Sequence, residues 1–231
     1  PELHQGAAAP TAWDVHQATG VEYAHEAFGF TGAGQTVAVI DSGIWYQHVA
    51  LGGGYGQNYR VVGGWDFTGA GDSNPRDDGP AGFHGTHVAG IIGSSDSQYT
   101  GVAPEVDLVA LRVFDNQGNS DWGWIESALA WVHDNRDAFE NPITTVNLSL
   151  GADVNDASPP NWAMLEDEFT RLAADGIFVS VSAGNAFESY LSPGLAYPAS
   201  SPYVVPVAST NEQGELSYFS QRHSRAIAAP G

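Results

Sequence analysis

Three short motifs place an aspartate, a histidine and an asparagine where their side chains could do chemistry. Asp41 directly follows the β-branched run 36–40, so it stands at the end of a buried strand. His84 opens the small-residue run 84–92, whose glycines and alanine would let a helix lie close to a sheet. Asn185 follows another apolar run in a turn that glycine permits, where its amide could donate a hydrogen bond to a developing oxyanion.

Each motif has a plainer interpretation when it is taken alone. Asp41 and Gly43 could simply form a turn, as could Asn185 beside its glycine. His84 and His87 could form a metal pair, but this pair lacks the glutamate of the H-E-x-x-H motif and a third ligand. The three motifs therefore indicate a functional site only if the predicted helices and strands bring them together.

The hydrophobic pattern predicts a three-layer α/β fold with a mostly parallel sheet and helices on both faces, in a single domain over residues 1–231. In such sheets, functional side chains gather at the carboxyl ends of the strands. We expect an arm at 1–30 and a long surface loop at 52–71. The predicted strands are 36–40, 106–114, 143–150, 177–181 and 203–207; one helix follows Ser120 or Asp121, another runs from a cap at Asn161 to Gly176, and a third begins at His84.

The composition excludes several classes of function. The chain has 27 acidic residues against 7 basic ones, all arginine, for a net charge of −20, so its surface repels nucleic acids and anionic membranes. It has no cysteine, which rules out thiol catalysis and disulfides. We therefore expect neither nucleic acid nor membrane as a partner.

Six motifs, taken together, resemble the subtilisin-like serine proteases, the subtilase or peptidase S8 family. They occur in the family's order and cover nearly the whole chain. They are D-S-G-I at 41–44, H-G-T-H-V-A-G at 84–90, G-V-A-P at 101–104, N-L-S-L-G at 147–151, S-A-G-N at 182–185 and A-P-G at 229–231.

The resemblance implies a secreted serine endopeptidase that cleaves polypeptide substrates with an Asp-His-Ser triad. Asp41 would orient His84, His84 would be the general base and then the general acid, and Asn185 would help to form the oxyanion hole. Substrate would lie between 149–151 and an opposite edge strand at 116–120. The implied substrate-binding residues are Gly118, Ser120, Ser149, Leu150, Gly151, Ser182, Ala183 and Gly184, with Trp122 and Ile125 either in a distant apolar subsite or in the core.

The family's nucleophile lies in G-T-S-x-A, shortly after A-P-G, and no Gly-Thr-Ser occurs in the 231 residues. We therefore expect the sequence to stop before the nucleophile and before the family's C-terminal helices, and a second chain or segment to supply them. Alone, the 231 residues should be inactive. The alternative is a catalytically dead homologue that binds peptides in the same groove.

An acidic segment before the His84 motif could hold calcium, which prefers six to eight oxygen ligands on flexible loops. The candidate ligands are Asp72, Asn74, Asp77 and Asp78, and the resemblance supports a structural Ca²⁺ in this region. The alternative is a solvated acidic loop whose charge Arg76 balances.

Overall fold

The computed structural model describes residues 12–69, 71–79 and 83–231. The first eleven residues of the predicted arm lie outside this part of the chain. The elements, in chain order, are α1 (Ala12–Thr19), α2 (Val21–Phe28), β1 (Thr36–Asp41), η1 (Val49–Leu51), β2 (Val61–Asp66), α3 (His84–Gly93), β3 (Asp107–Arg112), α4 (Trp122–Asn135), β4 (Ile143–Leu148), β5 (Ala152–Asp156), α5 (Glu166–Ala174), β6 (Phe178–Ser182), α6 (Phe187–Tyr190), β7 (Leu195–Tyr197), β8 (Val205–Thr210) and β9 (Ile227–Pro230).

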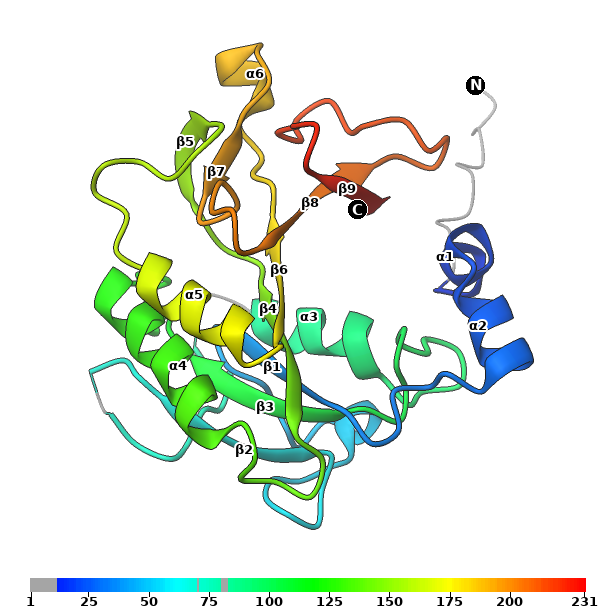
Figure 1. Cartoon of the computed structure of the whole chain (residues 1–231). Helices are drawn as coiled ribbons and strands as arrows, with labels where there is room; N and C mark the ends of the chain where they lie inside the picture. The colour runs from blue at the N-terminus through cyan, green and yellow to red at the C-terminus, as the bar shows by residue number, and fades with distance from the viewer. Residues whose placement is uncertain (1–11, 70, 80–82) are drawn as a thin grey trace, which may run out of the picture.

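Seven of the strands form one parallel sheet in the order β2-β3-β1-β4-β6-β8-β9. β1 lies in its interior, and all six of its residues are buried. An apolar strand with both faces covered is the pattern that the sequence predicted from the run 36–40. The sheet runs through the middle of the molecule (Figure 1).

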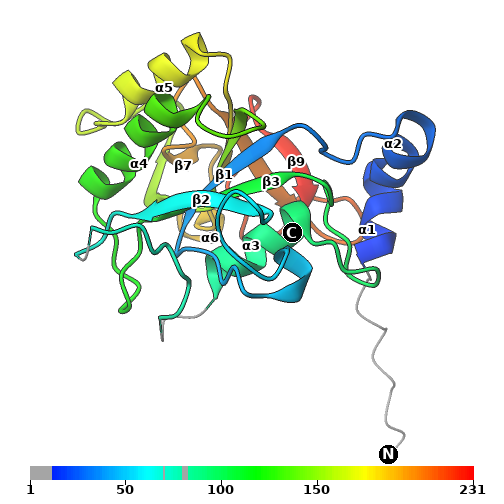
Figure 2. The same ribbon diagram turned by 90° about the horizontal axis from the view of Figure 1, so that it is seen from below.

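Helices cover the sheet on both faces, so the three-layer prediction is confirmed. α4 and α5 lie together on one face, and α3 lies on the other (Figures 1 and 2). The larger core cluster joins α4 and α5 to the sheet through residues such as Leu129 and Phe169. The smaller cluster packs Ala89 of α3 against Val39 and Leu108 on the opposite face.

The predicted surface loop at 52–71 is wrong in its second half, because β2 runs through it and pairs with β3. Two glycines disguise this strand. A Cβ at Gly64 would lie 1.9 Å from the carbonyl oxygen of Ala110, and a Cβ at Gly63 would lie 2.6 Å from the ring of Phe139. Glycine is therefore required by close packing, whereas in the sequence it indicates a loop.

Two further differences from the sequence prediction concern helices. Within the expected arm, residues 12–28 form α1 and α2. α5 begins at Glu166 rather than after Asn161, because the Leu165 amide donates to the hydroxyl of Tyr197 at 3.0 Å and the acidic first turn starts only there. Among the described residues, no helix is both long and apolar enough to cross a membrane.

Candidate active site

Three neighbouring strands deliver the candidate residues to one edge of the sheet. β1, β4 and β6 are adjacent and parallel, so their carboxyl ends lie at the same edge. Asp41 is the last residue of β1, Ser149 directly follows β4, and Ser182 ends β6. The topology thus brings together segments that are far apart in the sequence.

Asp41 and His84 form a hydrogen-bonded pair across β1 and the first residue of α3. The imidazole Nδ1 of His84 lies 2.7 Å from Oδ1 and 3.0 Å from Oδ2 of Asp41. The carboxylate is buried, with 1% of its side chain exposed, whereas 60% of the imidazole is exposed. Because Nδ1 faces the carboxylate, Nε2 on the far side of the ring points away from it.

The surroundings of His84 favour its charged form. The hydrogen bond to Asp41 raises the pKa of His84, partial burial of the ring lowers it, and the negative charges of Asp41 and Asp77 raise it further. The net effect is a raised pKa. An imidazole in this setting is a stronger proton acceptor than a free one.

A second set of contacts fixes the backbone around this pair. The Gly85 amide donates to Oγ of Ser42 at 2.9 Å. Thr86 donates to the Asp77 carboxylate through its amide at 3.1 Å and its hydroxyl at 2.7 Å, and the Thr86 hydroxyl accepts from the Trp45 amide at 2.8 Å. These contacts tie the first turn of α3 to the turn that follows Asp41.

Asp77 therefore satisfies an N–H group in the first turn of α3, a role that the sequence did not reveal. Its carboxylate is almost fully buried, and burial raises its pKa. A capping residue directly before a helix can be recognised from the sequence. Asp77 cannot be recognised in this way, because it lies seven residues before His84, the first residue of α3. The only sequence signal was an acidic residue upstream of a helix that has no capping side chain of its own.

Segments 149–151 and 182–184 lie side by side, and the Ser182 hydroxyl donates to the Leu150 carbonyl at 3.4 Å. The side chains of Leu150 and Ala183 are buried, so these segments present mainly backbone and small groups. A Cβ at Gly184 would lie 2.0 Å from Oε1 of Gln221, so glycine is needed there. Asn185 follows on an exposed bend at the same sheet edge.

The expected edge strand at 116–120 is instead a hairpin turn in which only Phe114 and Ser120 pair. The carboxylate of Asp115 accepts from the amides of Gln117 and Asn119 at 2.9 and 2.8 Å, and this local bonding bends the chain.

The remaining candidate substrate residues sit in and after this hairpin. Gly118 lies in the turn with a φ of 81°, and Ser120 donates to the Val113 carbonyl at 2.6 Å. Ile125 lies in the core with 3% exposure. Trp122 is partly buried, and its ring centroid is 5.3 Å from that of Tyr197.

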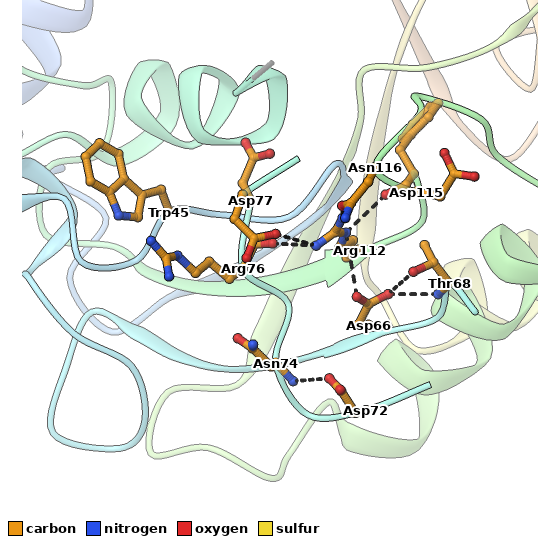
Figure 3. A network of polar contacts seen from close by, with 12 residues as sticks. Trp45, Asp66, Thr68, Asp72, Asn74, Arg76, Asp77, Arg112, Asp115 and Asn116 are labelled. Carbon is orange, nitrogen blue, oxygen red and sulfur yellow. Dashed lines mark hydrogen bonds and ion pairs between the residues drawn. The ribbon is translucent and has the colours of Figure 1, made fainter. Parts of the chain in front are cut away.

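The four candidate calcium ligands do not converge. Asp72 accepts from the backbone amide of Asn74, the side-chain Oδ1 of Asn74 accepts from the Tyr46 hydroxyl, Asp77 caps α3 and Asp78 pairs with Arg112. Figure 3 shows Asp72 and Asn74 apart from Asp77. Within the described ranges, no group of three or more His, Cys, Asp or Glu side chains could hold a metal ion. These residues therefore do not fit a calcium site as they are arranged.

Comparison with known proteins identifies the family of this chain. The family model described as the subtilase family matches residues 32–231, nearly the whole described chain. The chain belongs to the subtilase family. It is 33% identical over 206 residues to subtilisin E from Bacillus subtilis (strain 168) and to a subtilisin from Bacillus pumilus, and 31% identical over 227 residues to thermitase from Thermoactinomyces vulgaris.

The match covers this subtilase chain more fully than it covers its relatives. The alignments span 88% of the chain with both subtilisins and 96% with thermitase. They span 48% of the length of subtilisin E, 66% of the Bacillus pumilus subtilisin and 67% of thermitase. The chain thus spans about half the length of the subtilisins that it matches first.

Proposed function

We propose that this chain belongs to a serine endopeptidase of the subtilisin type, in which Asp41 and His84 are two members of the catalytic triad. One observation carries the proposal: a buried carboxylate holds Nδ1 of an exposed imidazole at 2.7 Å, at the sheet edge where parallel α/β folds place their sites. Membership of the subtilase family supports the same conclusion.

In this mechanism Asp41 accepts a hydrogen bond from Nδ1–H of His84, which leaves the lone pair of Nε2 free to take a proton from the attacking serine. The imidazolium that forms is stabilised by Asp41, and it then gives the proton to the departing amine. The Asn185 side-chain amide would donate to the oxyanion, and the loss of one such donor lowers kcat by about 10²–10³.

The serine itself is not identified among the 231 residues, so the triad needs one from outside them. We propose that it comes from a continuation of the chain or from a second polypeptide. Extended polypeptides are the proposed substrates, bound along 149–151. A location outside the cell stays a prediction implied by the resemblance.

Labelling with a serine-directed phosphonate tests the proposal. We expect the whole protein that carries this chain to form a covalent adduct on one serine, because the general base makes that hydroxyl nucleophilic. The His84→Ala variant should label far more slowly, and the isolated 231-residue chain should not label. Absence of an adduct on the whole protein would favour the peptide-binding alternative, and labelling that is indifferent to His84 would overturn the proposed base.

A further inference from the structure

A single buried guanidinium, that of Arg112, joins three separate segments beside the candidate active site. Its Nε donates to the Phe114 carbonyl at 3.1 Å, and its Nη1 donates to the Arg76 carbonyl at 2.7 Å and to Oδ1 of Asp78 at 3.2 Å. Its Nη2 donates to Oδ1 of Asn116. Only 8% of the side chain is exposed. Figure 3 shows this fork between the 76–78 segment and Asn116.

The third segment is the end of β2, where Asp66 meets the same guanidinium. Oδ2 of Asp66 lies 3.6 Å from Nε of Arg112, and its Oδ1 accepts from the amide and hydroxyl of Thr68 at 2.8 and 2.6 Å. One delocalised cation thus faces two carboxylates, those of Asp66 and Asp78. A planar fork with five N–H donors can serve these partners at once, whereas a lysine ammonium cannot.

The first of the joined segments leads to the catalytic pair. Between the two Arg112 contacts at 76 and 78 stands Asp77, which binds Thr86 in the first turn of α3. The Pro75 carbonyl, directly before Arg76, accepts from the amide of Ile44 at 3.0 Å. Ile44 lies in the turn that follows Asp41. Segment 75–78 therefore rests on both elements that carry the pair.

The second joined segment is the hairpin 114–120, which includes the residues 116–120 that the family resemblance places opposite 149–151 across the substrate. Arg112 binds the first half of this hairpin through Phe114 and Asn116. The hairpin is closed by the Asp115 amide donating to the Asn119 carbonyl at 2.9 Å and by the Gly118 amide donating to the Asp115 carbonyl at 3.0 Å. The guanidinium thus connects this hairpin to the segment 76–78 and to the end of β2.

We propose that Arg112 is a positioning residue that sets the substrate-facing hairpin 114–120 relative to the Asp41–His84 pair, and that this internal cation takes the structural part that calcium was expected to play in the acidic segment. This inference rests on the proposed function. It agrees with the failure of Asp72, Asn74, Asp77 and Asp78 to converge, since Asp78 is paired with the guanidinium.

The first test compares kinetics of the whole protein on long and short substrates. In Arg112→Lys the charge stays but the fork is lost, so KM should rise about tenfold for peptides with about four residues before the scissile bond. For single-residue ester substrates, which do not reach the hairpin, both kcat and KM should stay within about twofold. Asn116→Ala, which is less disruptive to folding, should shift KM in the same direction. The control is Arg171→Lys, a half-exposed arginine of α5.

Equal effects on long and short substrates, or none in either variant, would overturn the inference. The second test does not depend on activity, so it still decides the inference if the protein cleaves no peptide and the proposed function fails. In Arg112→Lys and Asn116→Ala, hydrogen exchange at the Asp115 and Gly118 amides should speed up by about tenfold or more, with no change in the control.

The same hydrogen-exchange measurement also tests whether calcium, rather than Arg112, stabilises the acidic segment. In the unmodified protein, exchange over residues 72–78 should be the same in millimolar calcium and in a chelator, because Asp78 is already paired with the guanidinium and Asp72 and Asp77 already accept hydrogen bonds from Asn74 and Thr86. Calcium-dependent protection of that segment would contradict the inference, and unchanged exchange at 114–120 in both variants would do so as well.

Discussion

The carboxylate and the imidazole of the candidate pair occupy opposite environments, and their chemistry follows from that difference. Asp41 is buried at the end of β1, where it accepts from Nδ1 of His84 and from the Ser42 amide at 2.7 Å. His84 is mostly exposed and can therefore meet a substrate. In the proposed mechanism, the buried carboxylate orients the ring and the exposed ring exchanges the proton.

This arrangement predicts the titration of His84. Its pKa should lie above the ordinary value of about 6.5, because Asp41 and Asp77 favour the imidazolium. As the pH is lowered, His84 is therefore protonated at a higher pH than a free histidine. The acidic limb of the kcat/KM profile should follow this raised pKa. The stability that the raised pKa contributes is complete below the unfolded pKa and is lost as the pH rises through the folded one.

NMR titration of the His84 ring measures this pKa directly. In Asp41→Asn the pKa of His84 should fall, because the charged partner is gone. A His84 pKa at or below that of a free histidine in the unmodified protein would contradict the assignment.

At the scale of the elements, the sequence predicted what local patterns determine and missed what distant contacts determine. The strand at 36–40 and the helix at His84 were predicted because apolar runs and small residues mark them. β2 was missed because Gly63 and Gly64 serve packing across the sheet. Asp77 and Arg112 were missed as supports of the site, since their partners are far away in the sequence.

The cap on α3 can be tested through stability. Asp77→Ala should lower the free energy of unfolding by about 1–2 kcal/mol, because the first-turn amide and the hydroxyl of Thr86 lose their acceptor. Chemical denaturation measures the change. Asp134→Ala, at an exposed position of α4, should cost less than about 0.5 kcal/mol. Equal costs for the two variants would argue against the cap.

The glycine in β2 makes a second prediction at this scale. Gly64→Ala should destabilise the fold by on the order of 3 kcal/mol, because the new Cβ would meet the Ala110 carbonyl in β3. Gly69→Ala, where a Cβ would meet nothing within 4 Å, is the control and should be nearly neutral. Thermal unfolding of the two variants distinguishes them, and a well-tolerated alanine at position 64 would mean that β2 does not pair as described.

At the scale of the whole molecule, charge dominates. With 27 acidic residues against 7 basic ones, the surface carboxylates repel one another. Salt shortens the screening length from about 10 Å at 0.1 M to about 3 Å at 1 M, so the compact state should gain stability as salt is added. We expect the thermal midpoint to rise steadily over this range, as measured by calorimetry. A midpoint that is flat or falls with sodium chloride would show that self-repulsion is unimportant.

The central claim is that Asp41 and His84 act together on the substrate, and the kinetics of their variants in the whole protein test it most directly. For hydrolysis of an extended peptide, Asp41→Asn should lower kcat on the order of 10⁴-fold and His84→Ala on the order of 10⁶-fold. The double variant should lose little more than His84→Ala alone, because the two residues act as a unit. His48→Ala, at an exposed histidine outside the pair, should remain within about twofold of the unmodified protein. Losses at 41 and 84 that are small, or that multiply in the double variant, would contradict the account.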